Sequence, residues 1–351
     1  MLEPYQARAR AHPDGVVDLS IGTPVDPTPA VIQRALAAAA DAPGYPTTAG
    51  TPAVREAAAG WLARRHGVVG VDPAAVLPTV GSKELIALLP MLLGLGPGDQ
   101  LVLPELAYPT YEVGARLAGL TAVRSDGLVG LGPARVGLVL VNSPANPTGR
   151  VLPVPHLRKV VAWARERGAV VASDECYLEF GWDAQPRSIL HPEVCDGRFD
   201  GLLAIHSLSK RSNLAGYRAG FVAGDPALVA ALLEVRKHAG LMMPLPVQAA
   251  MTAALDDDEH VTVQRGRYAA RRARLRPALA AAGFTVDDST AGLYLWATRG
   301  TDCWSTVDWL AARGVLVAPG EFYGPTGGRH VRFALTATDE RIAAAAARLA
   351  G

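Results

Sequence analysis

A lysine set among small hydroxyl residues stands past the middle of the chain and has the surroundings of a nucleophile. Lys210 follows the apolar run 202–205, with Arg211 next to it and Arg218 eight residues further on. A lysine attacks a carbonyl carbon only after it loses its proton, and burial and nearby cations promote that loss. Either arginine could also hold a phosphate. The stretch 207–220 therefore indicates a Schiff-base lysine beside a phosphate-bearing cofactor, pyridoxal phosphate; a basic surface loop is the alternative interpretation.

Three polar side chains elsewhere in the chain would suit a pyridine ring. Asp174 ends an apolar run, where its carboxylate can pair with a protonated ring nitrogen and keep the ring an electron sink. A helix N-cap is the more common role of an acid at such a place. Tyr177 and Asn146 can each donate a hydrogen bond to a phenolate oxygen on the ring. The alternative for Asn146 is a simple turn opener, because Asn-Pro is common in turns.

The segment 81–84 (Gly-Ser-Lys-Glu) opens a predicted helix and is a candidate phosphate site. Free N–H groups at a helix N-terminus bind phosphate, and a glycine permits close approach. Small-residue helix starts are frequent, so the assignment depends on partners elsewhere: the hydroxyls of Ser207 and Ser209 and the guanidinium of Arg218. Tyr108 follows a strand and precedes a proline, where it can stack on an aromatic ring or pack in the core.

Arg332 lies inside an otherwise apolar predicted strand, between Val331 and Phe333. An arginine in such a place is unusual and needs an anionic partner. A bidentate clamp on the α-carboxylate of an amino acid would satisfy it, and so would a structural salt bridge.

The predicted elements that must position these residues alternate between strands and helices. Strands are predicted at 16–21, 76–80, 101–103, 121–123, 136–141, 169–172, 202–205 and 217–222. Helices are predicted between them at 29–40, 51–65, 85–92, 110–117 and 154–167. Alternation of this kind, with polar clusters at the strand ends, is typical of a doubly wound, mostly parallel α/β sheet. Ligands bind to such sheets at the carboxyl ends of the strands.

The last third of the chain has a different pattern. Helices are predicted at 228–238, 247–255, 259–282, 306–312 and 339–349, with short strands near 284–286, 294–296, 315–317 and 331–333. This mixture indicates a smaller α+β domain. We expect an N-terminal segment of the small domain at 1–40, a large cofactor-binding domain at 41–240 and a C-terminal small domain at 241–351.

Composition excludes several other classes of protein. The 351 residues carry a formal net charge of +1, with no basic run or acidic tail that would suit nucleic acid or a membrane surface. The three cysteines lack metal-finger spacing, and their odd number argues against a disulfide framework. The N-terminus has no apolar core of a signal peptide, and no apolar run reaches transmembrane length. We therefore expect a cytoplasmic protein without a metal.

Five motifs, taken together, resemble a known family. They are Asn-Pro-Thr-Gly at 146–149, Asp-Glu-Cys-Tyr at 174–177, Ser-Leu-Ser-Lys at 207–210, Gly-Tyr-Arg-Ala-Gly at 216–220 and the late Arg332. Their order and spacing are similar to those of class I/II aminotransferases, which are fold-type I enzymes dependent on pyridoxal phosphate. The resemblance covers nearly the whole chain, from Gly22 to Arg332.

The resemblance implies a role for each candidate residue. Lys210 would form the Schiff base, Asp174 would pair with the pyridine nitrogen, and Arg332 would bind the substrate α-carboxylate. The remaining cofactor contacts would be Asn146 and Tyr177 on the ring oxygen, Tyr108 stacked on the ring, and Ser82, Lys83, Ser207, Ser209 and Arg218 around the phosphate. Gly22 would lie in the substrate loop. In this family the active sites lie at a homodimer interface, and Tyr45 matches the tyrosine that reaches the phosphate of the neighbouring subunit.

A narrower resemblance concerns the substrate. The segments 19–27, 43–52, 206–213, 317–324 and 330–332 look like those of the actinobacterial type of N-succinyl-LL-diaminopimelate aminotransferase. That resemblance implies transfer of an amino group between N-succinyl-LL-2,6-diaminopimelate and 2-oxoglutarate, in the route to diaminopimelate and lysine. The N-terminus departs from the pattern, because the chain starts closer to the first strand than in many related chains.

The candidate cations for the distal carboxylates of such a substrate are Lys83, Arg211 and Arg329. A solvated surface charge is the alternative for each of them and the favoured interpretation for Arg329. Other functions compatible with the same motifs are transamination of another amino acid, such as aspartate, and elimination at Cβ as in a β-lyase. An aminotransferase-like sensor domain of a transcription regulator would need a DNA-binding module ahead of the first strand, and the 15 residues before Val16 leave no room for one.

Overall fold

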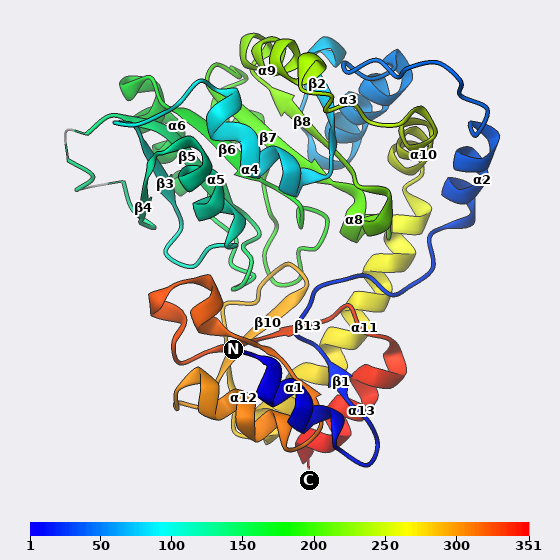
Figure 1. Ribbon diagram of the computed structural model, residues 1–351, viewed down its shortest axis with the longest axis vertical. Coiled ribbons are helices and arrows are strands. Elements are labelled where there is room, and N and C mark those ends of the chain that lie inside the picture. The colour runs from blue at the N-terminus through cyan, green and yellow to red at the C-terminus, as the bar shows by residue number, and fades with distance from the viewer. Residues whose placement is uncertain (129, 133, 351) are drawn as a thin grey trace.

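The computed structural model describes residues 1–128, 130–132 and 134–350 and folds into two domains (Figure 1). Within these residues the larger domain is built on a seven-stranded sheet of order β2-β8-β7-β6-β5-β3-β4. Its strands are β2 (Val76–Val80), β3 (Gln100–Leu103), β4 (Thr121–Arg124), β5 (Val136–Asn142), β6 (Val170–Asp174), β7 (Leu202–Ser207) and β8 (Ala219–Gly224). All neighbours are parallel except β8, which runs antiparallel to both β2 and β7.

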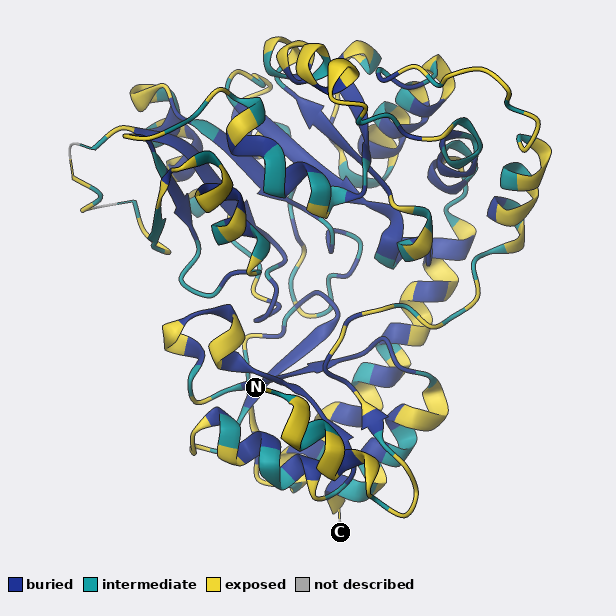
Figure 2. Ribbon diagram, viewed as in Figure 1, coloured by how far each residue is buried: buried dark blue, intermediate teal, exposed yellow. Residues whose placement is uncertain are grey.

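Helices cover both faces of this sheet, as the apolar strands require. One face packs against α4 (Ser82–Leu92), α5 (Thr110–Ala118) and α9 (Pro226–His238). The other packs against α3 (Pro52–His66), α6 (Val154–Arg167) and the short α7 (Pro192–Cys195). Every residue of β5, β7 and β8 is buried, and Figure 2 shows the exposed residues on the outward sides of the helices. The predicted α/β fold class is confirmed.

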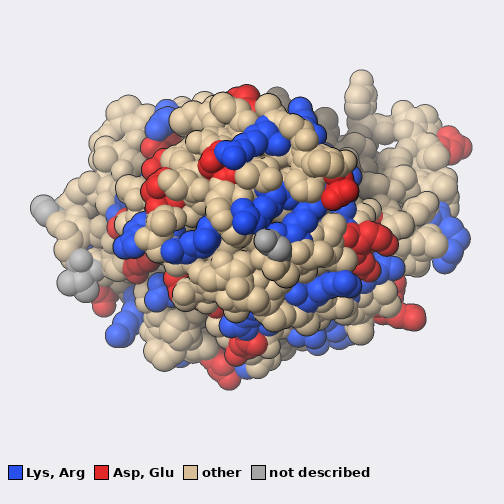
Figure 3. Space-filling view, turned by 90° about the horizontal axis from the view of Figure 1, so that it is seen from below, with Lys and Arg blue, Asp and Glu red and all other residues tan. Residues whose placement is uncertain are grey.

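The smaller domain is an antiparallel sheet of order β12-β13-β10-β9 packed against helices. Its strands are β9 (Thr285–Asp287), β10 (Tyr294–Thr298), β12 (Ala318–Pro319) and β13 (Val331–Ala334), and β1 (Val17–Asp18) pairs with β11 (Val315–Leu316) beside them. The helices are α1 (Glu3–Arg10), α11 (Glu259–Ala281), α12 (Cys303–Ala311) and α13 (Asp339–Ala350). Both termini lie in this domain (Figure 1). The face of the molecule that Figure 3 shows from below carries interspersed positive and negative side chains.

The predicted domain boundaries at 40/41 and 240/241 stay a prediction. Two helices near these boundaries pack against the large domain. Helices α2 (Ala30–Ala38) and α10 (Leu245–Asp256) lie outside the predicted large domain, yet they pack on each other, and α10 packs on α3. Ile32 and Met251 join the hydrophobic core of the large sheet. Across the described ranges, no helix is long and apolar enough to span a bilayer.

One predicted strand proved shorter than expected, and another is shifted along the chain. The strand expected at 16–21 is reduced to β1, and the one expected at 217–222 starts at Ala219. The second difference has a local cause: 215–217 form a 3-10 turn, and Arg218 has a left-handed backbone with φ +55°. Because that conformation interrupts an extended strand, it turns the backbone immediately before β8.

Candidate active site

A pocket of about 520 Å³ lies where the carboxyl ends of the large sheet's parallel strands face the small domain. Parallel strands bring residues of different motifs to one edge: Asn142 ends β5 directly beside Asp174, and Asp174 is opposite Ile205 of β7. The predicted site residues that line the pocket are Gly22, Ser82, Lys83, Tyr108, Asn146, Asp174, Tyr177, Ser207, Ser209, Lys210, Arg218 and Arg332. The structure therefore brings together residues that are up to about 300 positions apart.

Asp174 is the buried acid of this pocket. Its Oδ2 accepts a hydrogen bond from the Tyr111 hydroxyl at 2.8 Å, and its Oδ1 accepts from the backbone N–H of Cys176 at 3.2 Å. Burial raises the pKa of the Asp174 carboxyl, while these two donors oppose that rise. No lysine or arginine among the described residues forms an ion pair with Asp174. The carboxylate is therefore available to a cationic group in the pocket.

Asn142 holds two of the predicted residues in place, although the sequence reasoning passed over it. Its Nδ2 donates to the backbone carbonyl of Asp174 at 2.8 Å, and its Oδ1 accepts from the backbone N–H of Asn146 at 2.7 Å. A signal was present in the sequence, since Asn142 is the first polar residue after the apolar run of the central strand.

Arg332 lies on β13 and is buried, with 5% of its surface exposed. Its Nη1 donates to Oδ1 of Asn146 at 2.7 Å, and its Nη2 donates to the backbone carbonyl of Ser20 at 2.6 Å. The Nε atom is buried without a hydrogen-bond partner. No carboxylate of the described chain lies within salt-bridge distance, so the expected alternative of a structural salt bridge is not what satisfies this guanidinium.

Lys210 lies on a single helical turn, α8 (Leu208–Arg211), that follows β7 directly. The turn is capped by Ser207, whose hydroxyl accepts a hydrogen bond from the backbone N–H of Ser209 at 3.2 Å. The Nζ atom of Lys210 donates to the backbone carbonyl of Gly22. The lysine amine is thereby directed into the pocket and toward the small domain.

A cradle for a phosphate lies at the start of α4. Gly81 has a left-handed φ of +76°, and a Cβ at this position would collide with the guanidinium of Arg218. The glycine thus lets the cation approach the first N–H groups of α4, which have no intrahelical partners. Ser82 and Ser207 add hydroxyl groups to the same pocket. Guanidinium, hydroxyl and backbone donors together are the groups that bind a phosphate dianion.

Comparison with known proteins identifies this arrangement. The family model for aminotransferase class I and II matches residues 14–349. The chain belongs to this family. Members of the family depend on pyridoxal phosphate, and so does this aminotransferase. The donors around Gly81 fit the phosphate of that cofactor, and the buried Asp174 fits its ring nitrogen.

Relatives of this aminotransferase include two similar bacterial proteins. A probable aminotransferase of Mycobacterium tuberculosis is 67% identical over 344 residues, covering 98% of this chain and 82% of that protein. The 4-dedimethylamino-4-oxo-anhydrotetracycline transaminase OxyQ of Streptomyces rimosus is 64% identical over 349 residues, covering 99% and 97%. Among solved structures, a probable N-succinyldiaminopimelate aminotransferase from Thermus thermophilus superposes with a TM-score of 0.88 at 32% identity, covering 99% and 98%.

The aminotransferase pocket also contains an aromatic group around Arg332 that was only partly predicted. Tyr177 and Tyr294 face each other with 3.0 Å between their hydroxyl oxygens. Burial, with Tyr294 as a neighbour, raises the pKa of Tyr177 well above its usual value, so its phenol stays protonated as a donor. Tyr108 also lines the pocket, with Nζ of Lys83 5.3 Å from its ring centroid. The sequence pattern around Tyr294 is that of a buried strand, which hid its place in the pocket.

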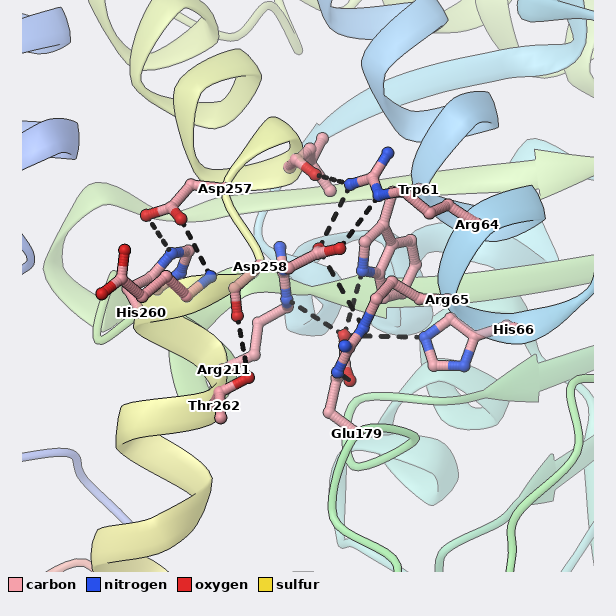
Figure 4. A network of polar contacts seen from close by, with 12 residues as sticks. Trp61, Arg64, Arg65, His66, Glu179, Arg211, Asp257, Asp258, His260 and Thr262 are labelled. Atoms are coloured by element: carbon pink, nitrogen blue, oxygen red, sulfur yellow. Dashed lines mark hydrogen bonds and ion pairs between the residues drawn. The ribbon is translucent and has the colours of Figure 1, made fainter.

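Two of the cations considered for the substrate lie outside the pocket, which corrects the candidacy of Arg211 and agrees with the surface-charge interpretation of Arg329. Arg211 is buried behind the pocket, where its Nε lies 3.6 Å from Glu179 and its guanidinium 5.1 Å from the ring of Trp61 (Figure 4). Successive helical residues point about 100° apart, so Lys210 can face the pocket only if Arg211 faces the core. Arg329 is exposed and donates to the carbonyl of Gly300, outside the pocket.

Tyr45 is the one predicted site residue that does not line the pocket of the described chain. Its surface is 97% exposed in the single subunit. Its predicted contact with the phosphate of a neighbouring subunit stays a prediction.

Proposed function

We propose that this aminotransferase converts N-succinyl-2-amino-6-oxopimelate and glutamate into N-succinyl-LL-2,6-diaminopimelate and 2-oxoglutarate, and the reverse. Four cations line the pocket, and two of them, Lys83 and Arg332, remain once Lys210 is assigned to the Schiff base and Arg218 to the phosphate. The observation that carries the proposal is that neither of these two pairs with a carboxylate of the described residues. A substrate with several carboxylates suits such a pocket. The name of the Thermus thermophilus neighbour points the same way.

The proposed roles follow from the chemistry of each side chain. Pyridoxal phosphate, when bound, supplies a carbonyl for the amino group and a ring that takes up the charge left at Cα. Arg332 binds the α-carboxylate and presents the Cα–H bond to the amine of Lys210. That amine would remove the Cα proton as general base and deliver it to C4′ of the cofactor as general acid. Asp174 keeps a proton on the pyridine nitrogen.

Two half-reactions share these groups in a ping-pong scheme. Glutamate leaves as 2-oxoglutarate before the succinylated oxo acid enters, so Arg332 must bind both. Tyr177 and Asn146 donate to the ring oxygen, Tyr108 stacks on the ring, and Ser82, Ser207, Ser209 and Arg218 surround the phosphate, which leaves Lys83 for the substrate. Gly22 contributes the substrate loop.

We also propose that the enzyme is a cytoplasmic homodimer with shared active sites. The extreme exposure of Tyr45 suits a side chain that reaches a second subunit. Three free cysteines suit a reducing compartment.

A second candidate function is amination of a polycyclic ketone, as the name of OxyQ describes for that relative. The observation in its favour is 64% identity over 97% of OxyQ. At such a level of identity two aminotransferases can share most of the site and differ in the acceptor that they bind.

The experiment that tests both uses purified holoenzyme with glutamate as donor. We expect kcat/KM for N-succinyl-2-amino-6-oxopimelate to exceed that for oxaloacetate or 4-dedimethylamino-4-oxo-anhydrotetracycline by about 100-fold, because the succinylated acceptor carries three carboxylates and oxaloacetate only two. Lys210→Ala should lower kcat at least about 100-fold. A preference for the polycyclic ketone would replace the proposal with the second candidate, and release of pyruvate from a β-substituted amino acid would favour a β-lyase.

A further inference from the structure

Tyr294 lies between the residues proposed to bind the substrate and those proposed to bind the cofactor. It begins β10, and 4% of its surface is exposed. Trp296 is paired with Arg332 across the β10–β13 ladder. Because side chains alternate along a strand, Tyr294 projects from the same face as Trp296 and is a diagonal neighbour of Arg332. Its ring centroid lies 4.0 Å from Cζ of Arg332.

The hydroxyl of Tyr294 connects the small domain to the large one. Its oxygen lies 3.0 Å from the oxygen of Tyr177, which follows β6, and either hydroxyl can donate. When Tyr177 donates its own hydrogen to an acceptor in the pocket, the hydrogen between the two phenols must come from Tyr294. Such an ordered chain makes Tyr177 a stronger donor, since consecutive hydrogen bonds polarise one another.

The same hydroxyl lies against the backbone of Gly22. A Cβ added at Gly22 would collide with the Tyr294 hydroxyl, so this position accepts only a residue without a side chain. The carbonyl of Gly22 in turn accepts a hydrogen bond from Nζ of Lys210. The position of the Tyr294 hydroxyl therefore determines how close the substrate loop comes to the lysine amine.

We propose that Tyr294 is a positioning residue of this transaminase with two separable tasks. Its ring holds the guanidinium of Arg332 in the orientation that receives a carboxylate. Its hydroxyl directs the hydroxyl of Tyr177 toward the ring oxygen of the cofactor. The inference rests on the roles proposed above for Arg332 and Tyr177.

The hydroxyl is tested with Tyr294→Phe in substrate-free holoenzyme, by following the absorbance of the bound cofactor against pH. Without the hydrogen bond from the Tyr294 hydroxyl, Tyr177 stabilises negative charge on the ring oxygen of the cofactor less well. The Lys210 nitrogen next to that oxygen then keeps its proton up to a higher pH. The midpoint of the absorbance change should move to higher pH by up to about one unit. Tyr323→Phe is the matched control, because its ring lies 5.0 Å from the same guanidinium while its hydroxyl makes no recorded bond to Tyr177 in the described chain. Equal midpoints for wild type, Tyr294→Phe and Tyr323→Phe would overturn this task.

The ring is tested with Tyr294→Leu and glutarate, a dicarboxylate without an amino group, by calorimetry on holoenzyme. Loss of the aromatic face under Arg332 should weaken glutarate binding by about 2- to 30-fold, whereas Tyr294→Phe keeps the ring and should stay within about 2-fold. Wild-type affinity for glutarate in a folded Tyr294→Leu would overturn the proposed task of the ring. Should Tyr294→Leu fail to fold, Tyr294→Trp keeps an aromatic face, and its Kd compared with that of Tyr294→Met decides the same question.

Arg332→Lys separates this inference from the proposed function. If Arg332→Lys binds glutarate as tightly as wild type, the proposed role of Arg332 is wrong, and the inference about the ring falls with it. If Arg332→Lys loses glutarate and Tyr294→Leu does not, Arg332 keeps its role and only the inference about Tyr294 is overturned.

Discussion

The hydroxyl of Tyr111 donates a hydrogen bond to Oδ2 of Asp174 at 2.8 Å, and both side chains are buried. Tyr111 comes from α5, which packs on the sheet face next to β6, so its phenol reaches the end of that strand. Burial raises the pKa of Tyr111 well above its usual value, which keeps the phenol a donor. The Tyr111 hydroxyl is thus a neutral donor that favours the ionised form of the buried Asp174 carboxyl.

Removing that donor should weaken catalysis without removing the acid. In Tyr111→Phe the Asp174 carboxyl stays buried but loses a donor to its ionised form, so its pKa rises further. We expect kcat to fall about 10-fold, measured with glutamate and 2-oxoglutarate exchange, and Asp174→Ala to cost at least about 100-fold.

The control is Tyr268→Phe, which deletes a buried hydroxyl that has no hydrogen-bond partner in the described structure. Its kcat should remain near that of wild type. A Tyr111→Phe enzyme as active as Tyr268→Phe would show that the hydrogen bond to Asp174 has no catalytic use.

The space beside Gly81 predicts a phosphate-specific loss of cofactor affinity. In Gly81→Ala the new methyl group displaces the Arg218 guanidinium, and the backbone of this residue (φ +76°, ψ +159°), which only glycine adopts readily, is strained by about 1–3 kcal/mol. We expect the apo-protein to bind pyridoxal phosphate at least about 10-fold more weakly, while its affinity for pyridoxal changes little.

Gly70→Ala provides the comparison for this prediction, because Gly70 has φ +81° and no atom within 4 Å of an added Cβ. It should lower the stability to a similar degree and leave both affinities unchanged. If the two alanine variants lose the same cofactor affinity, backbone strain rather than the collision with Arg218 is the cause.

We predict that the exposed Lys83 affects KM differently for the two substrates. Lys83 lines the pocket and pairs with no carboxylate of the described chain. We expect Lys83→Ala to raise KM for the succinylated substrate by about 10-fold and KM for glutamate by about 2-fold or less, because the succinylated substrate carries two carboxylates beyond the one proposed to bind Arg332, whereas glutamate carries one. Lys159→Ala, an exposed lysine of α6, is the control. An equal rise for both substrates would instead assign Lys83 to the phosphate or to the structure.

Because Glu175 is a buried carboxyl, we predict that the free energy of unfolding falls as pH rises. Burial raises the pKa of this carboxyl to about 7, and the pKa of the neighbouring His206, 3.5 Å away, is held low by burial, so His206 offers no countercharge. Between about pH 4.3, where the unfolded carboxyl titrates, and about pH 7, the folded chain binds more protons than the unfolded chain. Deprotonation of Glu175 should therefore cost about 3 kcal/mol of unfolding free energy across this range.

Glu175→Gln should remove that cost, because a glutamine carbonyl can still accept the hydrogen bond from Ile189 N–H, which Glu175 Oε1 accepts at 2.7 Å. Urea unfolding at pH 5 and pH 8 measures the effect: the variant should gain about 3 kcal/mol relative to wild type at the higher pH. Glu166→Gln, at an exposed position of α6, should show no such gain. Parallel pH profiles for Glu175→Gln and wild type would contradict the prediction.

Much of the fold and many of the pocket residues were predictable because their signals are local. An all-apolar run such as 136–141 indicates a central parallel strand, and the polar residues that follow such runs must meet at one edge of the sheet. The alternation of strands and helices therefore placed Asn146, Asp174 and Lys210 near one another before any contact was known. Strand ends were less predictable, because the 3-10 turn at 215–217 and the left-handed backbone of Arg218, which set the start of β8, leave no mark in the apolar pattern.

The sequence by itself determined which residues carry polar chemistry and which strand ends present them. Only the tertiary structure decided their partners. Tyr111 lies 63 residues from Asp174, and Tyr294 lies 117 residues from Tyr177, so no local pattern connects them. The same holds for Arg211, which adjoins Lys210 in the chain yet packs against Glu179 behind the pocket. Hydrogen-bond partners are selected by the packing of distant elements, whereas a strand or helix is selected largely by the apolar period of its own residues.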